Sequence, residues 1–249
     1  MKTISIRRTI RRYTDQDVSE DLLERLLTEA MRTQTMGNLQ LYSVVVTRSD
    51  EKKRQLAPAH FNQPMVTEAP VILTFCADFR RTTRWAEERQ AHPGYDNLLS
   101  FVNAATDALL YCQTFCNLAE EAGLGLCFLG TTVYMPHQII DALQLPRLVF
   151  PVATITMGWP AEMPPLTDRL PLRAVCHKET FADYTAEGID DFYAVKESLE
   201  ENRRFVEVNQ KETLAQVFTD CRYTRKDNEA LSLTLLDSLR RQGFISGAE

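Results

Sequence analysis

The sequence predicts an α+β sandwich in which a central mixed sheet is flanked by helices. Four short runs typical of strands, three of them rich in β-branched residues, alternate with segments whose apolar residues recur at helical spacing; the runs lie near 43–47, 71–76, 125–129 and 150–157. Strands interleaved with helices are typical of a mixed α/β architecture. No Gly-x-Gly-x-x-Gly motif follows any of these strands, so a doubly wound dinucleotide-binding sheet is not indicated.

The composition favours one globular domain over residues 1–249, with a core to about residue 170 and a helical excursion and C-terminal arm over about 171–249. The net charge of −6 argues against nucleic acid or an anionic membrane as a partner. No apolar run reaches the roughly 18–20 residues that a membrane span needs, and no apolar signal-peptide segment opens the chain. We therefore expect a cytoplasmic protein.

Positive charge is concentrated near the N-terminus, where 7–13 carries four arginines in seven residues. Guanidinium groups match phosphate oxygens two at a time, and the Thr9 hydroxyl adds a further donor or acceptor. Ile4, Ile6, Ile10 and Tyr13 are apolar positions that would hold this segment against a core. The segment is therefore predicted to bind a phosphate monoester, with a solvated basic patch as the alternative.

The first half of the chain carries clear boundary signals. Ser19 precedes two acidic residues and a run of leucines at helical spacing, which predicts a helix start. Gly37 and Asn38 supply turn chemistry before the strand at 43–47. A charged surface helix is expected over 49–57, and a loop over 58–66 that contains Gln63.

In the second half, a polar helix is expected to about residue 90, followed by a long apolar helix over 98–122. That helix is central, either buried within one subunit or packed between two. Gly123 indicates a helix stop and Gly130 a turn after the third strand, with a helix at 136–143 before the fourth. Beyond residue 171 the chain is rich in charged residues and is predicted to be helical. One helix over about 186–204 is expected to project from the core as an excursion.

The six cysteines and four histidines show no metal-ligand or redox-dithiol spacing, and buried free thiols are expected instead. The cysteines are Cys76, Cys112, Cys116, Cys127, Cys176 and Cys221.

Several motifs together resemble the flavin-dependent nitroreductase family. They are the Arg-Arg-Thr-Ile-Arg-x-Tyr run at 7–13, Leu-Gly-Thr at 129–131, and Gly-Trp-Pro-Ala-Glu-Met-Pro at 158–164 followed by Arg-Leu-Pro at 169–171. The chain is most similar to the NADPH-preferring, oxygen-insensitive nitroreductase and flavin reductase branch. The resemblance covers roughly the first 170 residues in the right order.

The resemblance implies an FMN cofactor, NADPH (or NADH) as co-substrate, and a homodimer with FMN at the subunit interface, wrapped by the excursion helices. Gln63 would bond the polar edge of the flavin ring, Gly130 would let the backbone approach it, and residues 35–38 would come from the second subunit. The implied cofactor-binding residues are Arg7, Arg8, Thr9, Arg11, Thr35, Met36, Gly37, Asn38, Gln63, Leu129, Gly130, Thr131 and Arg169.

The sequence departs from the branch near the second phosphate contact. Relatives carry a lysine two residues before the arginine, where this chain has Thr167. We expect the extra arginine Arg7, which replaces a histidine common in relatives, to offset that loss. Arg203 and Arg204 are candidates for a nicotinamide-phosphate contact, with a solvated charge pair as the alternative.

The implied function is an FMN-dependent NAD(P)H oxidoreductase that reduces nitroaromatics, quinones or free flavins by ping-pong transfer. The cofactor would carry the chemistry, so no side chain need act as nucleophile, and Arg11 would stabilise negative charge on reduced flavin or hold its phosphate. A non-catalytic flavin-binding or sensing protein is the alternative, and an anion-binding scaffold without flavin is a third.

Overall fold

The computed structural model describes residues 4–245, which form two compact units. Unit 1 contains the residues up to Pro165 and those from Leu231 onward, and unit 2 is Leu166–Ala230. None of the helices between residues 4 and 245 has the length and apolarity that a membrane crossing requires.

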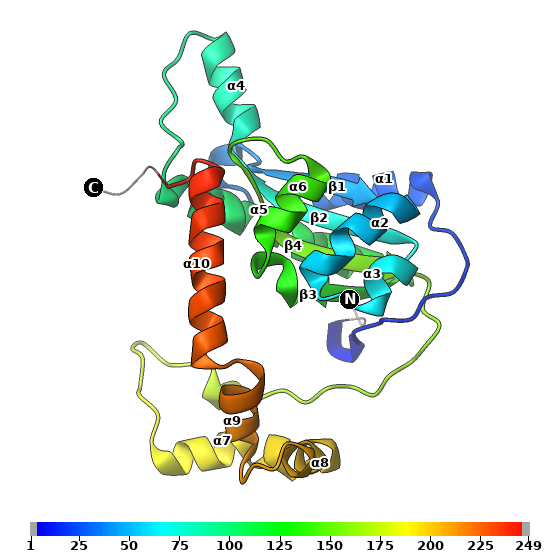
Figure 1. The fold of residues 1–249 in the computed structure, drawn as a ribbon, viewed down its shortest axis with the longest axis vertical. Helices are drawn as coiled ribbons and strands as arrows, with labels where there is room; N and C mark the ends of the chain where they lie inside the picture. The colour runs from blue at the N-terminus through cyan, green and yellow to red at the C-terminus, as the bar shows by residue number, and fades with distance from the viewer. Residues whose placement is uncertain (1–3, 246–249) are drawn as a thin grey trace. The chain divides into compact units, whose positions relative to one another are not determined.

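A four-stranded antiparallel sheet forms the centre of unit 1, with the strands in the order β1-β2-β4-β3 (Figure 1). The strands are β1 (Tyr42–Thr47), β2 (Val71–Asp78), β3 (Gly125–Leu129) and β4 (Val149–Gly158). The inner strands β2 and β4 are buried along their whole length, which explains their continuous apolar runs. Strand β3 is an edge strand, so its outer side is open to pairing by another segment.

Helices cover both faces of this sheet, and the side chains of β2 alternate between them. On one face, α1 (Glu20–Ala30) and α5 (Leu98–Glu121) pack with Val71, Leu73 and Phe75 in the larger apolar cluster. On the other face, Ile72 packs with α2 (Asp50–Leu56), η3 (Ala57–His60), α3 (Pro64–Glu68) and α6 (Pro136–Leu143) (Figure 1).

The C-terminal helix α10 (Arg225–Arg241) leads into a segment that anchors itself in unit 1. Phe244 is fully buried, and the amide nitrogen of the buried Gln242 donates to three carbonyl groups. These carbonyls belong to Leu145, Pro146 and Val149. The glutamine therefore satisfies the backbone between α6 and β4, where no regular structure would do so.

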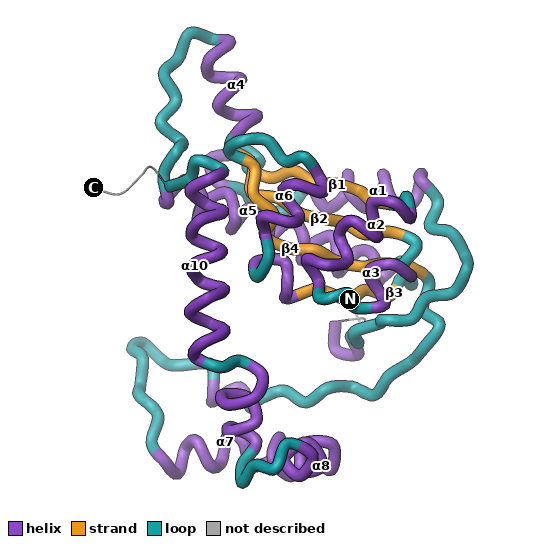
Figure 2. Tube along the Cα trace, in the orientation of Figure 1, coloured by secondary structure: helices purple, strands orange, loops and turns teal. Residues whose placement is uncertain are grey.

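Unit 2 is helical but contains a long irregular stretch over residues 175–185, before its first α-helix (Figure 2). Its elements are η5 (Leu172–Ala174), α7 (Ala186–Ser198), α8 (Glu200–Val208), α9 (Leu214–Gln216) and the π-helical turn η6 (Val217–Arg222), before α10 begins. The remaining elements of unit 1 are η1 (Ile4–Ile6), η2 (Met36–Asn38), α4 (Arg80–Glu88) and η4 (Gly130–Val133).

The four strands and the helix starts at Ser19 and Pro136 are confirmed, but four expectations were wrong. The four-stranded sheet is wholly antiparallel rather than mixed. The helical segments between strands return the chain so that each strand runs opposite to the strand it pairs with. The expected loop over 58–66 contains parts of η3 and α3.

The other two corrections concern unit 2. The expected single helix over 186–204 breaks at Leu199, which has extended backbone angles with no proline or glycine to signal the break. Four cysteines are buried, but Cys176 and Cys221 are exposed because they lie in charged, loosely packed segments.

Candidate functional site

The arginine-bearing segment 7–13 runs beside the open edge of β3. The Ile10 amide donates to the Leu126 carbonyl at 2.9 Å, and Tyr13 forms an antiparallel bridge with Pro160. Gly125 permits this approach, because a Cβ at that position would lie 2.7 Å from Cγ2 of Ile10. Ile10 is buried and Tyr13 is half-buried as expected, but the expectation for Ile4 and Ile6 was wrong, because both are more than half exposed. The segment is thus held by backbone pairing and by packing from Ile10 onward, and is not a free basic tail.

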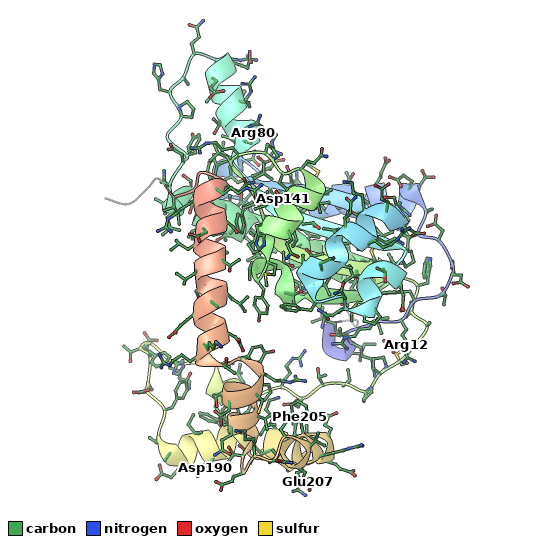
Figure 3. The ribbon with its side chains drawn as sticks, in the orientation of Figure 1. Arg12, Arg80, Asp141, Asp190, Phe205 and Glu207 are labelled. Carbon is green, nitrogen blue, oxygen red and sulfur yellow. The ribbon has the colours of Figure 1, made fainter. Side chains whose placement is uncertain are left out.

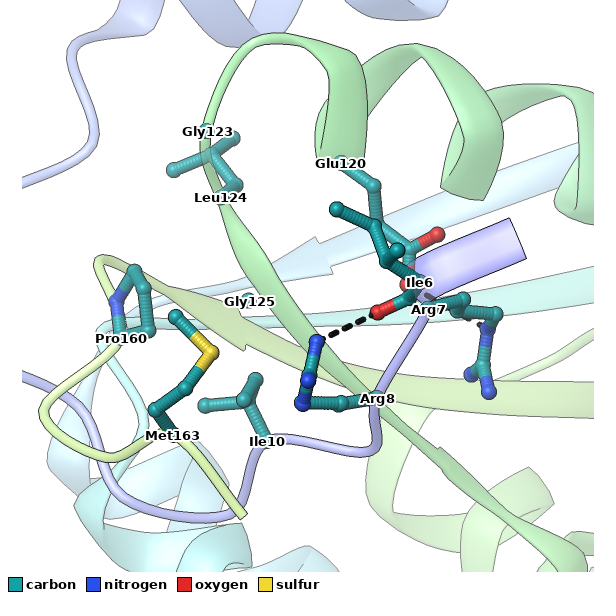
Figure 4. Close-up of a pocket in the computed structure, with 10 residues that line it drawn as sticks. All are labelled: Ile6, Arg7, Arg8, Ile10, Glu120, Gly123, Leu124, Gly125, Pro160 and Met163. Carbon is teal, nitrogen blue, oxygen red and sulfur yellow. Dashed lines mark hydrogen bonds and ion pairs between the residues drawn. The ribbon is translucent and has the colours of Figure 1, made fainter. Parts of the chain in front are cut away.

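Arg7 and Arg8 already have protein partners (Figure 4). Arg7 Nε lies 3.3 Å from Glu120 Oε1, and Arg8 donates from Nε to the Pro164 carbonyl at 2.6 Å and from Nη1 to the Ile6 carbonyl at 2.8 Å. Part of each guanidinium group is therefore used to hold the segment in place. Among residues 4–245, the other guanidinium nitrogens of Arg7 and the second terminal nitrogen of Arg8 have no hydrogen-bond partner and could bind a ligand.

A pocket of about 160 Å³ lies beside these two arginines, but its lining does not suit a phosphate. Most of its wall is apolar, and it also contains Glu120. The Glu120 Oε2 atom is buried without a partner, and burial raises the pKa of this carboxyl while Arg7 opposes that rise. A carboxylate in the wall would repel a dianion, so a phosphate fits better farther along the segment.

Arg11 and Arg12 follow at the exposed part of the segment, and Arg12 is labelled in Figure 3. Their backbone amides both donate to Glu162 Oε1, at 2.8 and 3.2 Å. The Arg11 side chain reaches the Cys127 thiol, whose pKa is raised by burial and held back by this guanidinium group. Among the described residues, neither arginine side chain has a carboxylate partner within ion-pair distance, and the Thr9 hydroxyl has no hydrogen bond.

Gln63 and Thr131, which are 68 positions apart, are connected through His60. The Gln63 amide nitrogen donates to the His60 carbonyl at 3.1 Å, and His60 Nδ1 lies 2.8 Å from Thr131 Oγ1. His60 is fully buried, and burial lowers its pKa to about 4. The imidazole is therefore neutral at neutral pH.

The backbone at Gly130 faces open space. A Cβ built at this residue would meet no atom within 4 Å, so packing within this chain does not require the glycine. Leu129 beside it is buried, and Thr131 is partly exposed. A glycine that packing within the described residues does not require, next to the partly exposed hydroxyl group of Thr131, suits close approach by a flat ligand.

The loop that contains Thr35, Met36, Gly37 and Asn38 is organised by the buried carboxylate of Asp107 on α5. Asp107 accepts from Thr35 Oγ1 at 2.5 Å and from the Met36 amide at 2.9 Å. It also accepts from the Leu41 amide at 3.1 Å. Gly37 and Asn38 have positive φ angles of 55° and 56°. No hydrogen bond among the described residues joins this loop to the arginine segment or to Gln63.

Arg169 belongs to unit 2 and is exposed. Its Nη1 donates to Thr167 Oγ1 at 2.8 Å and to the Asp168 carbonyl at 2.7 Å. Arg203 and Arg204 lie in pockets lined by glutamates, which favours the solvated charge pair over a phosphate contact.

Sequence reasoning missed three residues that shape the site: Asp107, His60 and Glu162. A single acidic residue within the apolar stretch of α5 was a visible signal, because a buried carboxylate must be hydrogen-bonded. His60 and Glu162 gave no such signal, since their partners lie far away in the sequence.

Comparisons with known proteins identify the family of this chain. The family model described as "Nitroreductase family" matches residues 4–159. A curated relative, "FMN reductase (NADPH)" of Bacillus subtilis, is 33% identical over 194 residues, covering 77% of this chain and 76% of its own. The chain therefore belongs to the nitroreductase family.

Two solved structures extend the likeness over nearly the whole chain. A protein from Bacteroides fragilis NCTC 9343 is 63% identical with a TM-score of 0.98, and the match covers 99% of this chain and 100% of that one. The NfrA1 nitroreductase of B. subtilis is 27% identical with a TM-score of 0.85, covering 98% of both chains.

Proposed function

We propose that this protein is an FMN-dependent NAD(P)H oxidoreductase that reduces nitroaromatics, quinones or free flavins. The observation that carries the proposal is the arrangement around β3. Exposed Arg11 lies along its edge, and open backbone at Gly130 with partly exposed Thr131 follows its end. The curated relative named FMN reductase (NADPH) supports the same activity.

The residues fit the two ends of FMN. Arg11 and the Thr9 hydroxyl would hold the phosphate, and Arg7 and Arg8, which border the pocket that Glu120 lines, would add positive charge nearby. Arg169 stays a sequence-based prediction of a further phosphate contact. Gln63 and Thr131 would offer a side-chain amide and a hydroxyl to the polar edge of the ring, and Leu129 and Gly130 would lie beside it. The loop of Thr35, Met36, Gly37 and Asn38 would complete the site from a second copy of the chain.

A homodimer is part of this proposal, and the exposed apolar face of α5 supports it. Five large apolar side chains on this helix are 41–69% exposed, which is costly for a free surface. They are Leu98, Leu99, Val102, Leu109 and Leu110. The excursion in unit 2 would wrap the partner, as expected from the sequence. A cytoplasmic location belongs to the same proposal.

The chemistry that FMN supplies when bound is acceptance of hydride from NAD(P)H and delivery of electrons to a second substrate. The chain's own groups bind and orient: arginines neutralise the phosphate, and Gln63 and Thr131 fix the ring by hydrogen bonds. Arg11 would also stabilise negative charge if its guanidinium group reaches the ring. No described side chain is required as a nucleophile.

Arg11→Ala tests the site, with Arg12→Ala as its matched control, because both changes remove one exposed guanidinium group from the same segment. If Arg11 holds phosphate, FMN should bind about 10- to 150-fold more weakly, since a hydrogen bond to a charged group contributes about 1.5–3 kcal/mol. If it acts at the ring, turnover at saturating FMN should fall instead. Equal FMN affinity and turnover in the two variants would remove Arg11 from the site.

A further inference from the structure

His60 lies where two segments proposed to contact FMN meet. It ends η3, and the next two residues, Phe61 and Asn62, have left-handed φ angles of 54° and 52° that turn the chain back. This turn brings both the backbone amide and the side-chain amide of Gln63 to the His60 carbonyl, at 3.2 and 3.1 Å. The imidazole points to Thr131, whose hydroxyl oxygen is 2.8 Å from Nδ1.

The surroundings of the ring select one tautomer. Nε2 of His60 is buried and has no hydrogen-bond partner in the part of the chain that the structure describes. A neutral imidazole carries its proton on only one nitrogen. A buried N–H without an acceptor is rarer and more costly than an unused lone pair. The proton therefore belongs on Nδ1, from which it is donated to Thr131 Oγ1.

This tautomer decides what Thr131 can do. With its oxygen accepting from His60, the hydroxyl proton of Thr131 is not used in that bond. Thr131 is partly exposed and follows Gly130, beside which the space is open. The hydroxyl is therefore available as a donor to a ligand there. The low pKa of His60, caused by burial, keeps this arrangement through the neutral range.

We propose that His60 is a positioning residue, which orients the Thr131 hydroxyl as a donor through its imidazole and the Gln63 amide through its carbonyl before FMN binds. This inference rests on the proposed function, because it concerns how the same site recognises the flavin. His60 need not touch FMN itself.

Substitutions at His60 separate the role of each nitrogen. The amide nitrogen of His60→Asn stands close to the position of Nδ1, whereas that of His60→Gln extends toward Nε2. FMN titration of flavin-free full-length protein, followed by flavin fluorescence, should give about tenfold weaker binding for His60→Ala and His60→Gln, equivalent to about 1.4 kcal/mol. His60→Asn should bind within about threefold of the unaltered protein.

Thr131 supplies the second half of the test. Thr131→Val should weaken FMN binding as His60→Ala does, and Thr131→Ser should preserve it. Combining His60→Ala with Thr131→Val should add little to Thr131→Val alone, because the two residues act through one hydroxyl group. Leu23→Ala is the control: it destabilises the apolar cluster on the other face of the sheet and should leave FMN affinity unchanged.

Two results would overturn the inference while leaving the proposed function intact. One is unaltered FMN affinity in His60→Ala or His60→Gln. The other is a histidine signal in ¹⁵N NMR of the unaltered protein that places the His60 proton on Nε2. If the unaltered protein neither binds FMN nor quenches its fluorescence, both the proposed function and this inference fail, and that outcome is distinct from the other two.

Discussion

Replacing Asp107 should destabilise the fold more than any surface charge does. This carboxylate is 2% exposed and accepts three hydrogen bonds, from the Thr35 hydroxyl and from the backbone amides of Met36 and Leu41. The Thr35 oxygen in turn accepts from the Gln40 amide at 2.9 Å. One side chain therefore accepts from two backbone amides of the loop and holds the hydroxyl group that accepts from a third.

The magnitude follows from these bonds. Hydrogen bonds to a charged group contribute about 1.5–3 kcal/mol each, but contributions within one network do not add fully. Asp107→Ala should therefore lower the free energy of unfolding by about 4 kcal/mol. Asp107→Asn keeps the shape but turns an N–H₂ group toward the Leu41 amide, and should cost about 2 kcal/mol.

Urea unfolding of the flavin-free protein measures this effect. With a denaturant slope near 2.5 kcal/mol per molar, the Asp107→Ala midpoint should fall by about 1.5 M. Asp237→Asn is the matched control, because its carboxylate is exposed and pairs only with Arg240 at 3.1 Å, a contact worth about 0.5 kcal/mol or less. If Asp107→Asn unfolds at the same urea concentration as this control, Asp107 does not organise the loop.

Three further predictions follow from packing and burial. Gly125→Ala should destabilise the protein by about 1–3 kcal/mol in urea unfolding, because the new methyl group meets Ile10. Gly130→Ala should change the free energy of unfolding by less than about 0.5 kcal/mol, because the site is open. The same variant should nevertheless weaken FMN binding in the fluorescence titration. Burial lowers the pKa of His60 to about 4 in the fold, from about 6.5 in the unfolded chain. Acidification from pH 6.5 to pH 4 should therefore lower the free energy of unfolding by about 3 kcal/mol. Urea midpoints compared across pH should show no such loss in His60→Asn. Gln242→Ala should cost about 3 kcal/mol in urea unfolding, since it leaves three carbonyls, two of them buried, short of a donor. A cost below about 0.5 kcal/mol would contradict its anchoring role.

Much of the fold was predictable because its signals are local. The β-branched run at Val44–Val46 lies within β1, and Ser19 accepts from the Leu22 amide, as expected for a helix start. Strand direction was not predictable in this way. Helices between strands are compatible with parallel or antiparallel neighbours. The direction of each strand therefore follows only from the pairing in the fold, such as the antiparallel pairing of β2 with β4.

The candidate site was likewise predictable only where its signals are local in the sequence. The arginine segment and the glycine after β3 could be recognised from residue type and spacing, and their roles as flavin contacts stay predictions. The partners that limit Arg7 and Arg8 could not be foreseen, because Glu120 and Pro164 lie more than 100 positions away. His60 was likewise invisible as a connection between Gln63 and Thr131 until the fold brought the segments together.

An absorbance spectrum of the purified protein with FMN, repeated after adding NADPH without oxygen, tests the central claim most directly. The proposed function predicts a bound-flavin spectrum that bleaches with NADPH and returns when a nitroaromatic or quinone is added. Bound flavin that NADPH fails to reduce would indicate a flavin-binding protein without this activity. A protein that takes up no FMN would contradict the claim altogether and leave the arginine segment to another anion.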